Sequence, residues 1–120
     1  MAYDPLLADR IRCYFDDQGY SFDDKNMMGG LCFMVDGKMA CGTHIDKTSD
    51  QSLLMARIGA DACDLALENP NVLPMNFTGR PMKGYIFVEE LGLRSDAQLH
   101  HWLKQCLDFN PLAKASKKRK

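Results

Sequence analysis

The sequence lacks several features that mark whole classes of protein. No apolar run approaches the roughly 20 residues of a membrane-spanning helix. The N-terminal stretch MAYDPLLADRIRCYFDD has no basic region followed by an apolar core, which is the pattern of a secretory signal. We therefore expect a cytoplasmic protein without a membrane segment, whose five cysteines are thiols. Cys13, Cys63 and Cys106 fall within helical patterns and are expected in the core.

The motifs of common catalytic sites are also missing. The sequence contains no C-x-x-C pair, no HExxH, no phosphate-binding glycine loop with Lys-Ser or Lys-Thr, and no GxSxG. His44 ends a predicted strand, while His100 and His101 are neighbours on a predicted helix and point about 100° apart. We therefore expect a chain that is not an enzyme, with no catalytic residue, no metal site and no cofactor.

What the sequence does contain fits one globular domain with an uneven charge. Of its 120 residues, 46% are apolar and 26% charged. Residues 1–110 carry 16 acidic and 10 basic side chains, a net charge of −6, while the remaining residues carry five basic side chains and no acidic one. We expect a domain over 1–110 and a disordered basic tail over 111–120. The tail residues expected to contact an acidic partner are Lys117, Lys118, Arg119 and Lys120. A solvated end is the alternative, and the acidic body disfavours direct DNA binding.

Local patterns predict three helices and six strands. Asp4-Pro5 begins a helix that Gly19 ends, and Ser95 begins the last helix. Between them lie strand patterns in SFDDKNMM, LCFMV, KMACGTHI and SLLMARIG, a short helix over 60–67, and two further strands in PMNF and GYIFV. The order α-β(4)-α-β(2)-α predicts an α+β fold with a mostly antiparallel sheet and helices packed on it.

The stretch GLCFMVDGKMACG predicts a tight hairpin around the Asp-Gly turn at 36–37. A two-residue loop would place Cys32 opposite Cys41 with Cα atoms about 4.5 Å apart, and would put Met34 and Met39 on the same face. One interpretation is a thiol redox pair, or a soft-metal site completed by the methionines. The other, which we favour, is sulfur used as compact apolar packing, because no neighbouring base holds either thiol as a thiolate.

A second candidate site is cationic. Arg80 and Lys83 lie on the glycine-flanked turn TGRPMKGY, and Arg57 leaves a nearby strand on the face of Leu53 and Met55. Together, Arg57, Arg80 and Lys83 would bind a carboxylate or phosphate, with the arginines supplying bidentate contacts. The alternative is that these cations form structural ion pairs with the abundant aspartates.

Four stretches together resemble the N-terminal domain of the TfoX/Sxy family. They are KNMMGGLCFMVDGKMACG, LMARIG, MNFTGRPMKGYIFV and the helical HHWLKQCL, and the resemblance covers about residues 10–110. It implies a small α+β domain with a curved sheet, a link to the regulation of natural competence, and no established enzymatic activity or catalytic residues. Longer members carry a second, C-terminal helical domain, where this sequence has a short basic tail.

We accordingly predict a small regulatory or binding module that acts through protein contact. The alternatives are an anion-binding protein or enzyme using the cationic pocket, and a redox or soft-metal sensor using Cys32 and Cys41. A homodimer is also expected if GYIFV is an exposed edge strand, because its backbone polar groups would otherwise stay unpaired.

Overall fold

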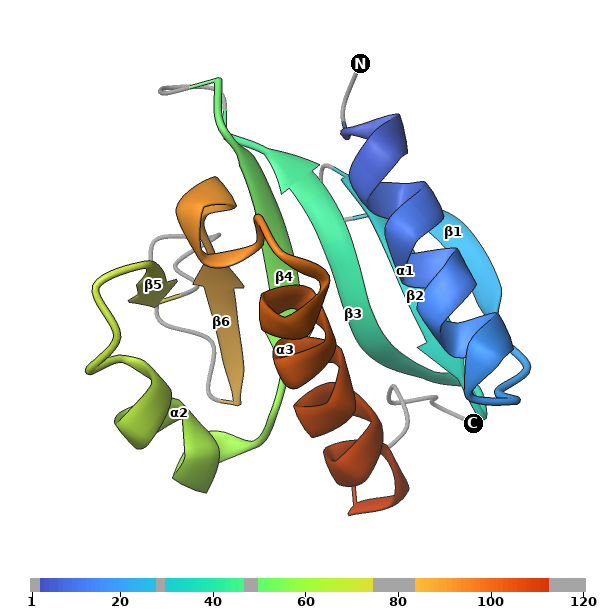
Figure 1. The fold of residues 1–120 in the computed structure, drawn as a ribbon. Coiled ribbons are helices and arrows are strands. Elements are labelled where there is room, and N and C mark those ends of the chain that lie inside the picture. The colour runs from blue at the N-terminus through green and yellow to red at the C-terminus, as the bar shows by residue number, and fades with distance from the viewer. Residues whose placement is uncertain (1–2, 28–29, 47–49, 75–83, 113–120) are drawn as a thin grey trace.

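The computed structural model describes residues 3–27, 30–46, 50–74 and 84–112, which form a twisted sheet with helices on one face (Figure 1). The α-helices are α1 (Pro5–Asp17), α2 (Ala60–Ala66) and α3 (Asp96–Phe109). The strands are β1 (Asp23–Met27), β2 (Gly30–Val35), β3 (Lys38–Ile45), β4 (Ser52–Arg57), β5 (Val72–Pro74) and β6 (Tyr85–Val88). Two 3₁₀ helices, η1 (Glu90–Gly92) and η2 (Asn110–Leu112), flank α3.

The six strands form one sheet in the order β1-β2-β3-β4-β6-β5, with every neighbouring pair antiparallel. The helices α1 and α3 cover one face of it, and α2 lies at the β5–β6 end (Figure 1). This arrangement confirms the predicted α+β class and element order. The observed strand β5 overlaps the predicted strand in PMNF at Pro74 only, and the rest of that prediction, residues 75–77, lies outside the described residues.

The strand β6 is not an edge strand, which corrects the argument for a homodimer through GYIFV. It pairs with β4 on one side and with β5 on the other. The edges of the sheet are β1 and β5. From Ile86 to Val88, β6 therefore has a paired strand on each side.

The ends of α1 and α3 follow from their sequences. The Asp4 carboxylate accepts a hydrogen bond from the Leu6 amide at 3.0 Å, and Pro5 occupies the first helical position. At α3, the Ser95 hydroxyl accepts from the Gln98 amide at 3.1 Å, while the Gln98 side chain accepts from the Ser95 amide at 3.0 Å. This reciprocal capping box satisfies two amides that the helix itself leaves unpaired.

We expect Ser95→Ala to lower the free energy of unfolding by about 1 kcal/mol, because the hydroxyl that caps α3 is lost. Urea denaturation followed by circular dichroism measures the change. Ser21→Ala is the matched control, since Ser21 is exposed and lies outside any helix or strand. If both variants had the same stability, the capping box would not contribute to folding.

The main core lies between the helices and the covered face of the sheet. The Phe33 ring on β2 meets those of Phe15 on α1 and Phe22 edge-on, with centroids 6.2 Å and 5.8 Å away. The Asn110 amide donates to the Val35 carbonyl at 3.2 Å and so ties the end of α3 to β2. Other large, fully buried members of this core are Ile11, Leu54, Ile86, Leu99 and Leu103.

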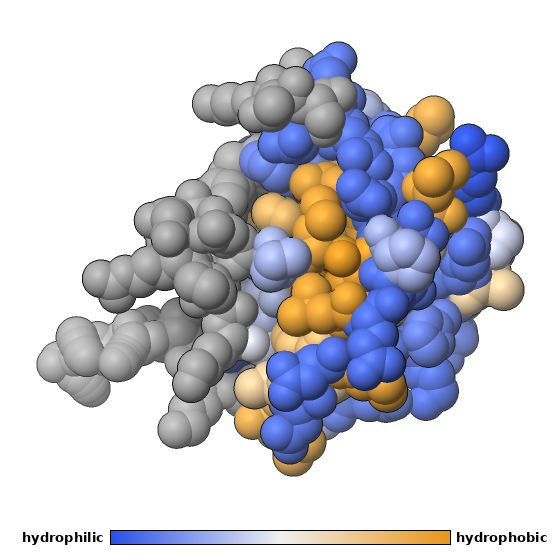
Figure 2. Space-filling model, turned by 90° about the vertical axis from the view of Figure 1, so that its left-hand side faces the viewer, coloured by the Kyte–Doolittle hydropathy of each residue, from blue (hydrophilic) through white to orange (hydrophobic). Residues whose placement is uncertain are grey.

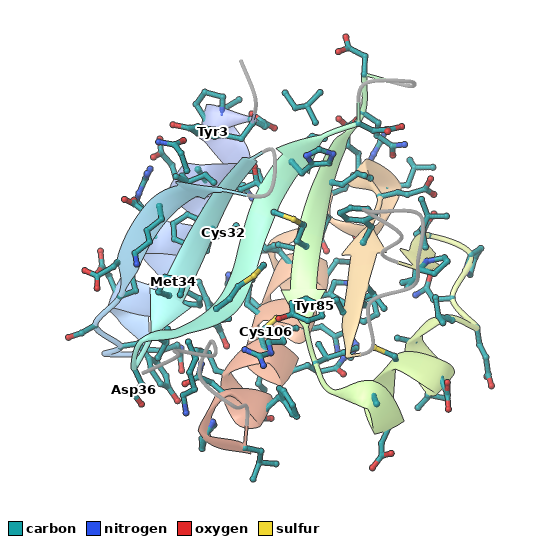
Figure 3. The ribbon with its side chains drawn as sticks, turned by 180° about the vertical axis from the view of Figure 1, so that it is seen from behind. Tyr3, Cys32, Met34, Asp36, Tyr85 and Cys106 are labelled. Carbon is teal, nitrogen blue, oxygen red and sulfur yellow. The ribbon has the colours of Figure 1, made fainter. Side chains whose placement is uncertain are left out.

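The opposite face of the sheet carries a separate, sulfur-rich cluster. It consists of Cys32, Met34, Met39 and Met55, with Tyr85 and Phe87 packed against it. Figure 3 views the sheet from this side, with Cys32 and Met34 on alternate positions of β2 and Tyr85 on β6. We call this group of six residues the sulfur cluster.

A β-bulge in the hairpin changes the predicted pairing of the cysteines. Asp36 and Gly37 both have positive φ, 57° and 74°, as the predicted two-residue turn requires. The register then shifts next to Phe33, so that Phe33 pairs with Cys41. Cys32 pairs instead with Gly42. The direct pairing of Cys32 with Cys41 was therefore wrong, because β3 contains one extra residue that turns Cys41 toward the helices.

Candidate functional site

Each cysteine of the predicted redox pair lies on a different face of the sheet. Cys32 belongs to the sulfur cluster, whereas Cys41 belongs to the helix-covered core. Burial raises the pKa of the Cys32 thiol to about 11. The pKa of Cys41 also lies well above its usual value, because of burial and then of its contact with Cys106. Both groups are protonated at neutral pH, and the geometry that motivated a redox interpretation is not present.

Arg57 lies at the end of β4, on the sulfur-cluster face, as its position in the strand predicted. Its Nη1 donates to the Met39 carbonyl oxygen at 3.5 Å. Its guanidinium carbon lies 5.4 Å from the ring centroid of Tyr85 and 6.0 Å from that of Phe109. Burial raises the pKa of the Tyr85 hydroxyl, and the charge of Arg57 opposes this rise. The guanidinium is thus held between two rings by cation–π contacts.

The remaining cationic candidates cannot be placed beside Arg57. Arg80 and Lys83 lie outside the described residues, so the three-residue anion pocket stays a prediction. The same holds for the basic tail with Lys117, Lys118, Arg119 and Lys120.

The described residues also bear on two other site types. Across 3–27, 30–46, 50–74 and 84–112, no three His, Cys, Asp or Glu side chains come together as a group that could hold a metal ion. In that same part of the chain, no helix has the length and apolar character needed to cross a membrane. The His44 ring stacks on that of Phe87 with centroids 5.7 Å apart, on the face of the sheet opposite Cys41.

Two adjoining cavities lie between α2 and α3. The larger, about 480 Å³ in volume, is lined by residues 58–62 and by the C-terminal end of α3. The smaller, about 230 Å³, lies further along α2, where Leu65 and Trp102 are among its walls. Ala62 and Gln105 line both cavities, which therefore adjoin, and we call the two together the α2–α3 groove. Its apolar lining comprises Ile58, Ala60, Ala62, Leu65, Ala66, Trp102, Phe109 and Leu112.

The walls of the groove are fixed by packing on the core. Trp102 is buried at 5% exposure, and Ala66 on the facing helix is also buried. Gly59, with φ +93°, lies against Phe109 so closely that a Cβ at this position would be 2.7 Å from a ring carbon. This contact joins the start of α2 to the end of α3. The groove is therefore a preformed feature of the fold.

The rim of the groove is acidic on the α2 side. Asp61 lines the larger cavity, and the segment 60–68 also carries Asp64 and Glu68 and no basic residue; all three acids are exposed. On the α3 side, Asp108 is paired with Lys104 at 3.0 Å. The negative charge at the groove thus comes mainly from α2.

Four leucines with exposed side chains belong to segments at the β5–β6 end of the sheet (Figure 1). Leu65 on α2, Leu67 after it, Leu73 on β5 and Leu91 on η1 are 71%, 39%, 38% and 56% exposed. Figure 2 shows this side, with apolar side chains in a band bordered by hydrophilic residues. We call Leu65, Leu67, Leu73 and Leu91 the leucine face. Exposed apolar surface of this kind, bordered by polar residues, is typical of protein-binding sites.

Sequence reasoning missed both the groove and the leucine face. Trp102 belongs to the buried apolar stripe of α3, but that stripe says nothing about the space left beside it. The usable signal was Leu65, which stands among Asp61, Asp64 and Glu68 on the solvent side of a short helix. A large apolar residue in such a charged setting indicates a contact surface.

A comparison with family models identifies the type of domain. The model of the TfoX N-terminal domain matches residues 17–110, which is most of the chain. The chain belongs to the TfoX N-terminal domain family. The matched region of this TfoX N-terminal domain runs from the last residue of α1 to the first residue of η2, and so includes both helices of the groove. No curated protein and no solved structure gave a significant match.

Proposed function

We propose that this TfoX N-terminal domain is a non-catalytic regulatory module that works in the cytoplasm by binding a protein partner. The observation that carries the proposal is the leucine face, which lies beside the preformed α2–α3 groove. A domain that buries apolar residues efficiently elsewhere would gain stability by covering these leucines, and a partner can do so. The resemblance to competence regulators supports a regulatory role for such binding.

The chemistry of the other candidate sites favours binding over catalysis. The thiols of Cys32 and Cys41 are protonated and buried, so neither is an activated nucleophile. The guanidinium of Arg57 already contacts two rings and a carbonyl. We therefore do not put forward the anion-binding and redox alternatives as functions.

The proposal predicts a site-dependent crosslink. A photoreactive amino acid in place of Leu73, in the full chain expressed in its own cells, is expected to give one discrete adduct with a protein partner. The same amino acid at Leu6 is the matched control, because Leu6 is 74% exposed and lies on α1, at the opposite end of the sheet from β5 (Figure 1). Mass spectrometry identifies the partner, and the purified pair should re-form the complex. Equal adducts from both positions, or none from Leu73, would refute the proposal.

A further inference from the structure

We propose that the α2–α3 groove receives a basic amphipathic helix from the protein partner. This inference rests on the proposed binding function and adds to it the place of binding and the chemistry of the occupant. It follows from the shape of the groove, the charge of its rim and the rigidity of its walls.

The shape of the groove suits a short amphipathic helix. The wall that α3 provides from His101 to Phe109 extends about 12 Å at ~1.5 Å per residue. Apolar anchors at positions i, i+4 and i+7 of a partner helix span about 10 Å by the same geometry. Such a helix would place its anchors against Trp102 and Leu65, above the small side chain of Ala62 that both cavities share.

The charge of the rim selects the polar residues of that helix. Asp61 lines the groove, Asp64 lies on the same helix and Glu68 follows its end, with no basic residue in the segment 60–68. Lysine or arginine residues beside the anchors would complement these carboxylates, increase the association rate and exclude acidic partners.

The negative charge of segment 60–68 also argues against a second copy of the chain and against nucleic acid as occupants of the groove. A second copy of the chain, placed with its own α2 against the groove, would bring the acidic segments 60–68 together. Nucleic acid would bring phosphates against the same carboxylates. A basic protein segment avoids both of these repulsions between like charges.

The rigidity of the walls makes such binding efficient. Trp102 and Ala66 are held by the core, and the contact between Gly59 and Phe109 joins the two helices where they line the larger cavity. The domain therefore loses little conformational freedom when the groove is filled.

The single tryptophan of the chain gives a direct readout, because Trp102 lines the groove. The probes are three synthetic peptides: a helical one with Leu at i, i+4 and i+7 and Lys elsewhere, the same peptide with Glu in place of Lys, and a scrambled Leu/Lys peptide. We expect a saturable change in Trp102 fluorescence with the first peptide and none with the other two. Added salt should weaken the binding.

Exposed residues of the groove allow variants that keep the fold. Leu65→Ala is expected to weaken binding of the Leu/Lys peptide about tenfold, and Asp61→Lys/Asp64→Lys to abolish its preference over the Glu peptide. The matched controls are Leu6→Ala for the exposed leucine and Asp16→Lys for an exposed acid on α1. Both controls should bind like the unaltered chain, and thermal melts should show all variants folded.

Several outcomes would overturn the inference. If the Glu peptide bound as tightly as the Leu/Lys peptide, the role of charge would be refuted. If Leu65→Ala left binding of the Leu/Lys peptide unchanged, the α2–α3 groove would not be the binding site. Dimers in sedimentation without peptide binding would assign the groove to a second copy. Tighter peptide binding by a full-length Lys117→Gln/Lys118→Gln/Arg119→Gln variant would assign it to the chain's own basic residues. If the Leu73 crosslink forms while every peptide fails, the groove inference falls and the binding function stands.

Discussion

Gly42→Ala is expected to lower the free energy of unfolding by about 3 kcal/mol. Gly42 lies on β3, inside the sheet, where it faces Cys32 on β2 and Met55 on β4. A Cβ at this position would be 2.7 Å from the Leu31 carbonyl oxygen and 3.2 Å from the Cα of Cys32. Both atoms belong to the backbone, so the new methyl group can be accommodated only if β2 and β3 move apart. Urea denaturation with and without the substitution measures the loss.

The matched control is Gly37 of the same hairpin, where glycine is favoured by the backbone conformation and not by lack of space. Gly37 has φ +74°, and a Cβ added there would meet nothing within 4 Å beyond its chain neighbours. Gly37→Ala is therefore expected to cost only the left-handed backbone strain, about 1 kcal/mol. If Gly42→Ala were no more destabilising than Gly37→Ala, the close approach of β2 and β3 at Gly42 would be refuted.

The element order was predictable because each boundary depends on local chemistry. Asp4-Pro5 and Ser95 satisfy the free amides at the starts of α1 and α3, and neither needs information from distant residues. The Asp-Gly turn at 36–37 is equally local, since both residues must adopt positive φ. The predicted order of helices and strands was confirmed for this reason.

The register of the hairpin was not predictable in the same way. Alternation of apolar and polar residues normally fixes which face a strand buries, but LCFMV and KMAC are apolar on both faces. A shift by one residue then costs little apolar burial, and the bulge beside Phe33 was invisible in the pattern. Because of this bulge, Cys41 lies in the main core and not, as the predicted register implied, on the face of Cys32.

The α2–α3 groove could not be predicted from the sequence because it lies between two helices. Its two walls, α2 and α3, are separated in the sequence by β5 and β6, and they come together only in the folded domain. Sequence patterns describe which face of each helix is apolar, but they do not give the distance between two helices. The predicted position of Arg57, in contrast, needed only strand alternation, and it was correct on the face of Met55.

The thiols are expected to differ in reactivity by at least about 100-fold. Cys13 was predicted in the core, but it is exposed on α1 and should react first with a disulfide reagent. The pKa of Cys32 rises from 9.0 to about 11 through burial. A pKa that is two units higher lowers the thiolate fraction of Cys32 at neutral pH about 100-fold, because each pKa unit is a factor of ten. Limited access through the sheet slows the reaction of Cys32 further.

The absorbance of the thiol that the disulfide reagent releases, followed over time on the native protein, separates the exposed thiol from the buried ones. We expect one fast thiol that Cys13→Ser removes, and all five thiols to react quickly once the chain is unfolded. The rate at Cys32 should rise about tenfold per pH unit until the pH approaches its raised pKa of about 11.

The same measurement decides between packing and redox chemistry for the sulfur of the hairpin. If mild oxidant consumed Cys32 and Cys41 together and faster than Cys13, the two thiols would have to meet, although they lie on opposite faces of the sheet. The hairpin would then have to lose its bulge in solution and adopt the directly paired register. A slow, independent loss of each thiol instead follows from two buried sulfurs that stabilise the sheet by packing, one on each side.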